Sequence, residues 1–202
     1  MIRIIGKIPK KVTIACSGGI DSMVVAHFLT QSKRKVDLAY FNHDTAHSRD
    51  AEEFVKEYAD TNNLNLSVGR VGGLKGKRSL EEFWRDERYK FLDSIKSNFI
   101  ITCHHLDDCV ETWLMSSFHG QGKLIPYKRS ANIYRPFLMT SKNTIRNYAK
   151  RKQVYWIDDP SNQVTNHMRN HVRLKVMPEV LIVNPGIRTT IRKKLIENFK
   201  YF

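Results

Sequence analysis

Short apolar runs alternate with helically spaced segments through the first 120 residues of this chain. The runs are typical of buried strands, and each is followed by a stretch that can form a helix. They cover residues 12–16, 36–41, 64–68 and 98–103. This alternation predicts a doubly wound α/β fold, in which helices cover both faces of a parallel sheet. Ligands of such folds bind beyond the carboxyl ends of the strands, so the residues that follow these runs are candidates for function.

From residue 120 onward the alternation gives way to a more helical pattern. Residues 141–152 look like a basic helix, and helical spacing over 166–177 ends at Pro178 before it resumes at 187–199. No stretch approaches the roughly 20 apolar residues that cross a bilayer. We therefore expect a nucleotide-binding α/β domain over residues 1–122. A mainly helical, basic extension over residues 123–202 would complete the active site and contact RNA.

Positive charge is concentrated in this second part. The chain carries 34 Lys and Arg against 20 Asp and Glu; residues 1–122 contribute a net +1 and residues 123–202 a net +13. Such an uneven field favours a nucleic-acid partner over a merely solvated basic face. The three cysteines, Cys16, Cys103 and Cys109, are too few for a disulfide framework, and the first residues lack the apolar core of a secretory signal. We predict a cytoplasmic protein without membrane contact.

The string Ser17-Gly18-Gly19-Ile20-Asp21-Ser22 follows the first apolar run. Two glycines between a strand and a helix let backbone N–H groups approach an anion, and Ser17 and Ser22 can donate to phosphate oxygens. Asp21 would repel phosphate unless a Mg²⁺ ion bridges the two. A lone Ser-Gly-Gly is more often an ordinary capped turn, but the full string after an apolar strand favours phosphate binding. The string lacks the lysine of Gly-x4-Gly-Lys loops.

Paired histidines and carboxylates follow the fourth apolar run. The motif His-His-Leu-Asp-Asp begins at His104, and a helix starting near Leu106 places Asp108 and Glu111 on one face. Two neighbouring carboxylates suit a cation, either Mg²⁺ or the ammonium group of a substrate. A zinc site with the nearby cysteines would need a second ligand cluster, which the sequence lacks.

Two further motifs are basic. Arg85 and Arg88 lie one helical turn apart, and the choice between binding phosphate and pairing with nearby acidic side chains stays open. The string Trp-Ile-Asp-Asp-Pro-Ser-Asn ends at Asn162, and Arg169-Asn170-x-x-Arg173 follows it. Each string alone could be a turn followed by a basic helix.

Taken in order, these motifs resemble the tRNA(Ile)-lysidine synthases, PP-loop enzymes among the N-type ATP pyrophosphatases. The resemblance runs from about residue 10 to about residue 180 and includes Glu111-Thr112 and Arg135-Pro136. It implies an adenine nucleotide alpha hydrolase-like fold and a two-step reaction. ATP would adenylate the oxygen on carbon 2 of the wobble cytidine in an isoleucine tRNA with a CAU anticodon. Free L-lysine would then displace AMP and form lysidine.

The resemblance also implies residue roles. ATP and Mg²⁺ would be the cofactors, with Asp21 holding the metal. The catalytic residues would be Asp21, Arg85, Arg88, His104, Asp108 and Glu111, with Arg85 or Arg88 and His104 acting at the phosphate or the target base. The ATP contacts would be Ser17, Gly18, Gly19, Asp21 and Ser22, and the lysine or tRNA contacts would be Asp108, Glu111, Asn162, Arg169, Asn170 and Arg173. A homodimer is also implied.

Two alternatives stay open. A cytidine thiolase of the same superfamily would use a Cys-x-x-Cys pair, whereas Cys103 and Cys109 lie six positions apart. A non-catalytic tRNA-binding protein derived from the synthase would first have lost Asp21, Asp108 or Glu111, and all three are present. Members of the family commonly carry further C-terminal domains that grip tRNA, while this chain ends at Phe202. We therefore expect a short form with less selective RNA binding.

Overall fold

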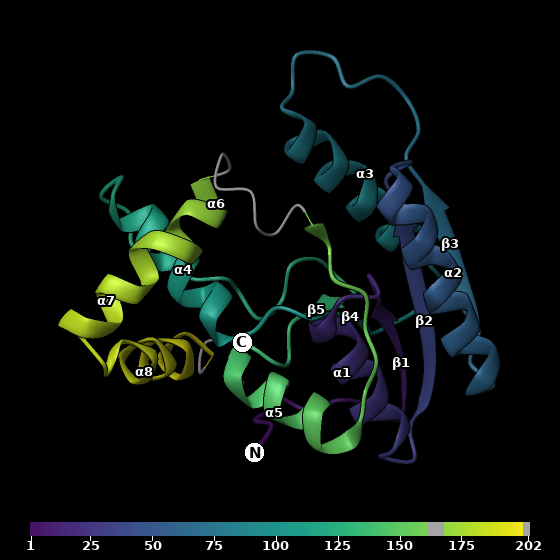
Figure 1. The fold of residues 1–202 in the computed structure, drawn as a ribbon, viewed down its shortest axis with the longest axis horizontal. Helices are drawn as coiled ribbons and strands as arrows, with labels where there is room; N and C mark the ends of the chain where they lie inside the picture. The colour runs from purple at the N-terminus through teal and green to yellow at the C-terminus, as the bar shows by residue number, and fades with distance from the viewer. Residues whose placement is uncertain (161–167, 200–202) are drawn as a thin grey trace.

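A five-stranded, all-parallel sheet forms the centre of the molecule (Figure 1). The computed structural model describes residues 1–160 and 168–199. The strand order is β3-β2-β1-β4-β5, so the order reverses between β1 and β4. The strands are β1 (Lys11–Ala15), β2 (Lys35–Asn42), β3 (Leu66–Arg70), β4 (Ile100–Thr102) and β5 (Ile133–Tyr134). The predicted doubly wound fold is confirmed, and ligands of such folds bind where the order reverses, here beyond the carboxyl ends of β1 and β4.

Helices cover both faces of this sheet. Residues of α1, α2 and α5 share one core with Val12 and Ile14 of β1, whereas Tyr89 and Leu92 of α3 pack on Ile100 in another. Figure 1 shows α1 and α5 side by side. The bounds are α1 (Ile20–Thr30), α2 (Ala46–Thr61), α3 (Leu80–Ser94), α4 (Leu106–Ser117) and α5 (Lys142–Lys152).

A second group of helices packs on α4. It consists of α6 (Met168–His171), the π-helical turn η2 (Val172–Val176), α7 (Met177–Val183) and α8 (Ile187–Phe199). Leu106 and Val110 of α4 share a buried core with Ile191 and Leu195 of α8, so the C-terminal helices lie on α4, the helix that follows β4 (Figure 1).

The helical break expected at Pro178 is wrong. Pro178 lies in the first turn of α7, directly after η2. The missing N–H of a proline is tolerated in a first turn, because the groups there have no partner within the helix. Within the described residues, no helix is both long enough and apolar enough to cross a bilayer.

Candidate active site

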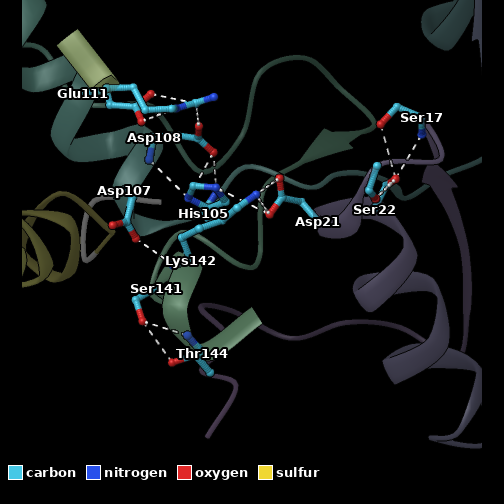
Figure 2. Close-up of polar contacts among 12 residues, drawn as sticks. Ser17, Asp21, Ser22, His105, Asp107, Asp108, Glu111, Ser141, Lys142 and Thr144 are labelled. Atoms are coloured by element: carbon cyan, nitrogen blue, oxygen red, sulfur yellow. Dashed lines mark hydrogen bonds and ion pairs between the residues drawn. The ribbon is translucent and has the colours of Figure 1, made fainter. Parts of the chain in front are cut away.

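The loop between β1 and α1 is held in shape by its own serines. Gly18 adopts a positive φ of 79°, which side chains disfavour, and packs against α2. The buried Ser22 hydroxyl accepts the Ser17 N–H at 3.1 Å and donates to the Gly19 carbonyl at 2.9 Å (Figure 2). Ser22 therefore supports the loop from inside, while Ser17 is exposed beside the start of α1.

The segment that follows α5 crosses this loop. The Ile157 N–H donates to the Gly18 carbonyl at 3.0 Å. Asp159, two residues further on, pairs with His47 of α2 at 4.0 Å. The Trp-Ile-Asp-Asp motif thus lies at the loop, a proximity that the sequence did not predict. Asn162, predicted to contact substrate, lies outside the described residues.

Asp21 is paired with Lys142, a residue that the sequence motifs missed. The Lys142 ammonium donates to both Asp21 carboxylate oxygens at 2.7 Å, and His105 Nε2 lies 3.6 Å from Asp21 Oδ1 (Figure 2). Lys142 is the first residue of α5, where a cation opposes the helix dipole. A lysine at this position, just after the N-cap Ser141, is the one sequence signal that pointed to a role outside its own helix.

Asp107 fixes the position of Lys142. This buried carboxylate accepts the Lys142 backbone N–H at 2.7 Å on one oxygen. Its other oxygen accepts Nε and Nη2 of Arg188, at 2.9 and 2.6 Å. Asp107 therefore joins the starts of α4 and α5 to α8, a wider role than complementing one helix dipole.

Asp108 and Glu111 lie together on α4, and two arginines already contact them. Arg173 Nε donates to Glu111 Oε1 at 2.7 Å, and its Nη2 lies 3.3 Å from Asp108 Oδ1. Arg169 Nε donates to Glu111 Oε2 at 3.3 Å. Burial alone would raise the pKa of Asp108, but His105, His104 and Arg169 hold that pKa below its ordinary value. The predicted cation-binding site therefore carries negative charge, and the guanidinium groups of Arg169 in α6 and Arg173 in η2 already fill it.

The two histidines have different surroundings. His105 is buried and caps α4: its Nδ1 accepts the Asp108 N–H at 3.3 Å, and its own N–H donates to Asp108 Oδ2 at 2.9 Å. His104 is less buried, and its ring contacts Thr102 Oγ1 at 3.2 Å. The pKa of His104 is lowered to about 3, chiefly by burial. The charges of Arg135, Arg169 and Arg88 also lower this pKa, and the charge of Asp108 opposes them. His104 is consequently neutral at physiological pH.

Arg85 and Arg88 do not make the surface pairs that were the alternative to phosphate binding. Asp86, the acid between them, pairs with Arg78 at 3.0 Å. Both arginines instead lie beside the Tyr89 ring, at 5.3 and 5.5 Å from its centroid. Among the described residues neither forms an ion pair with a carboxylate.

The residues of the loop fit Mg²⁺ bound together with a nucleotide. Mg²⁺ is usually held by one or two carboxylates plus the substrate's phosphate oxygens, and Asp21, four residues after the exposed Ser17, offers such a carboxylate. Within residues 1–160 and 168–199, no three His, Cys, Asp or Glu side chains are grouped closely enough to hold a metal by themselves. Nothing in that part of the chain supports the zinc alternative.

The three cysteines do not form a thiolate cluster. Cys16 and Cys109 are buried, Cys103 is partly buried, and all three are free thiols. Burial raises the pKa of each thiol. A raised pKa keeps a thiol protonated, and the thiolate is the nucleophilic form, so none of the three is activated as a nucleophile by its protein surroundings.

Several curated tRNA(Ile)-lysidine synthases are similar in sequence to most of this chain. The tRNA(Ile)-lysidine synthase of Exiguobacterium sibiricum is 30% identical over 190 residues, which are 89% of this chain and 46% of that protein. The synthase of Lactiplantibacillus plantarum is 31% identical over 194 residues, or 87% of this chain and 43% of that protein. The chain thus spans somewhat less than half the length of the curated relatives it matches.

Solved structures and a family model agree on the fold. The U34-tRNA thiolase NcsA of Methanococcus maripaludis matches with a TM-score of 0.76 and 16% identity, over 97% of this chain and 74% of that chain. The NH3-dependent NAD synthetase of Campylobacter jejuni matches with a TM-score of 0.52 and 15% identity, over 96% and 87%. Identities this low show the fold alone. The model of the ATP_bind_3 PP-loop domain matches residues 4–180, and the chain therefore belongs to this PP-loop family.

Proposed function

We propose that this protein joins free L-lysine to carbon 2 of the wobble cytidine in isoleucine tRNA with a CAU anticodon. ATP is cleaved to AMP and pyrophosphate, and the intermediate is an adenylated cytidine. The observation that carries this proposal is the link between the loop and the paired carboxylates. His105 lies 3.6 Å from Asp21 Oδ1 and also contacts Asp108. This contact supports an ATP site at the loop that would adjoin an amine site at Asp108 and Glu111.

The first step transfers the AMP part of ATP to the target base. The oxygen on carbon 2 of cytosine attacks the α-phosphorus of ATP, and the bond to pyrophosphate breaks. The loop N–H groups and the exposed Ser17 would face the phosphates of ATP. The Lys142 ammonium can turn from Asp21 toward the departing pyrophosphate and stabilise its charge. Mg²⁺, when bound at Asp21, would neutralise charge on that leaving group.

In the second step the ε-amine of lysine attacks carbon 2. The carbon–nitrogen bond forms, and AMP leaves with the oxygen that it had activated. Asp108 and Glu111 provide the negative charge that orients lysine, whose ammonium must replace the guanidinium groups of Arg169 and Arg173 there. The amine also loses a proton, and Glu111 is the carboxylate of the pair that can accept it. His104, with its pKa lowered to about 3, is too weak a base for that role.

Incorporation of labelled lysine into an unmodified isoleucine tRNA with a CAU anticodon tests the proposal, with ATP and Mg²⁺ present. We expect incorporation with equimolar release of pyrophosphate. Elongator methionine tRNA, which has the same anticodon, measures selectivity. The Asp108→Asn variant serves as the inactive control, since it removes one carboxylate and keeps the shape.

The alternatives predict other outcomes. A non-catalytic tRNA-binding protein would bind the tRNA without releasing pyrophosphate, and a thiolase would incorporate sulfur and leave lysine unused. Either result would overturn the proposal. Dimerisation, a cytoplasmic location and the division at residue 122 stay predictions.

A further inference from the structure

Four arginines surround the ring of Tyr89. The guanidinium carbon of Arg129 lies 3.6 Å from the ring centroid, and those of Arg85 and Arg88 lie at 5.3 and 5.5 Å. Arg135 Nη2 donates to the Tyr89 hydroxyl at 3.4 Å. The residues come from α3 and from the turn and strand around β5. We call Arg85, Arg88, Arg129 and Arg135 the Tyr89 arginine cluster.

No carboxylate balances this cluster among the described residues. Asp86 pairs with Arg78, and Asp93 accepts the Ser130 hydroxyl at 3.1 Å. Neither Glu81 nor Glu82 forms an ion pair with a described arginine. In the same part of the chain, the side chains of Arg85, Arg88 and Arg129 make no hydrogen bond to protein. Four like charges around one ring repel one another, and cation–π attraction offsets only part of that cost.

The most buried member of the cluster is also incompletely bonded. Arg135 is 2% exposed, and its Nη1 donates to the Pro126 carbonyl at 2.7 Å, but its Nε has no partner. Buried charged groups are normally paired. Burial and the charges of Arg85, Arg129 and Arg169 lower the pKa of Arg88, a second sign of excess positive charge.

The shape of the cluster suits a phosphate group. A guanidinium that lies flat on an aromatic ring keeps its N–H donors at the edge, and that fork matches two phosphate oxygens. Arg129 is exposed, so its N–H donors can be reached from solvent. Tyr89 is buried, and this burial holds its ring in place.

We propose that the Tyr89 arginine cluster binds a phosphate group and that Arg129 forms the outer side of the site. This inference rests on the proposed function, which supplies two sources of phosphate: the RNA backbone next to the target base, and ATP. Arg85 and Arg88 were candidates from the sequence, whereas neither a motif nor a comparison pointed to Arg129.

The Arg129→Gln variant of the full chain tests the site, and Lys128→Gln is its matched control. Lys128 is the adjacent residue, is also exposed and lies over the ring of Tyr134, so the control removes the same charge one position away. Two probes are used, an unmodified isoleucine tRNA transcript and a non-hydrolysable ATP analogue with Mg²⁺. Thermal unfolding of both variants checks that they fold equally well.

We expect Arg129→Gln to weaken binding of one probe about tenfold relative to Lys128→Gln, as lost charge-assisted hydrogen bonds would. Loss for the transcript alone identifies an RNA phosphate, and loss for the analogue alone identifies a nucleotide phosphate. Arg129→Lys should keep part of the affinity, because it retains the charge without the fork. Equal binding by the two glutamine variants, or no binding of either probe by the unaltered protein, overturns the inference.

This outcome is separable from that of the proposed function. If the unaltered protein ligates lysine while Arg129→Gln binds both probes normally, only the phosphate site is wrong. If the unaltered protein binds the transcript in an Arg129-dependent way but incorporates no lysine, only the proposed reaction is wrong.

Discussion

The charge of Asp21 is balanced by the Lys142 ammonium, 2.7 Å from both carboxylate oxygens. In the proposed reaction Asp21 would hold Mg²⁺ beside the phosphates of ATP, and an unpaired carboxylate would repel those phosphates. Lys142 would neutralise Asp21 before Mg²⁺ and ATP bind.

Replacing Lys142 with methionine should therefore slow pyrophosphate release at least about tenfold, since a charge that stabilises the leaving group is removed. Lys142→Arg should keep more of the rate than Lys142→Met. The measurement is pyrophosphate release at saturating ATP over a range of Mg²⁺ concentrations. Lys56→Met, at an exposed position of α2, is the control. Equal rates in the two methionine variants would show that Lys142 only stabilises the fold.

At the scale of elements, the strand order and the ends of β1 and β4 explain most of what could be predicted. Apolar runs indicate strands, and parallel strands bring the residues after them to one edge, so the loop and the His104 motif had to adjoin. Side-chain pairings between distant elements were beyond such patterns. Lys142 and Asp21 are 121 positions apart, and no spacing rule links residues that meet only through packing. The position of Arg129 on Tyr89 was missed for the same reason.

Asp107 gives a test at this scale, because it holds three helices at once. Asp107→Asn should lower the free energy of unfolding by about 2 kcal/mol, since it removes a charge from a buried pair whose arginine is partly exposed. Glu87→Gln, which removes the acid of a surface pair with Lys90, should cost under about 1 kcal/mol. Urea unfolding of both variants measures the difference. Equal midpoints would mean that the hydrogen bond from the Lys142 backbone N–H holds the three helices together without the charge of Asp107.

At the scale of the whole molecule, α4 joins the candidate site to the C-terminal helices. Helix α4 shares a core with α8, and the arginines of α6 and η2 reach the carboxylates of α4. Among the described residues, the positive charge of Arg169, Arg173 and Arg188 is therefore held at the site by packing and by ion pairs. A positive field fixed in this way draws a phosphate backbone toward the edge of the sheet where the chemistry is proposed to occur.

Removing three exposed charges from residues 123–202 should therefore weaken tRNA binding more than removing three exposed charges from residues 1–122. Changing Lys150, Arg151 and Lys152 to Gln should flatten the plot of log affinity against log salt concentration by about 2, at roughly 0.7 for each lost phosphate contact. The control changes Lys11, Arg70 and Lys90, each of which already has an acidic partner. Binding of the tRNA transcript at several salt concentrations gives both slopes. If the slopes change equally, the C-terminal charge is a solvated surface, and RNA contacts are confined to the Tyr89 arginine cluster and the α6 region.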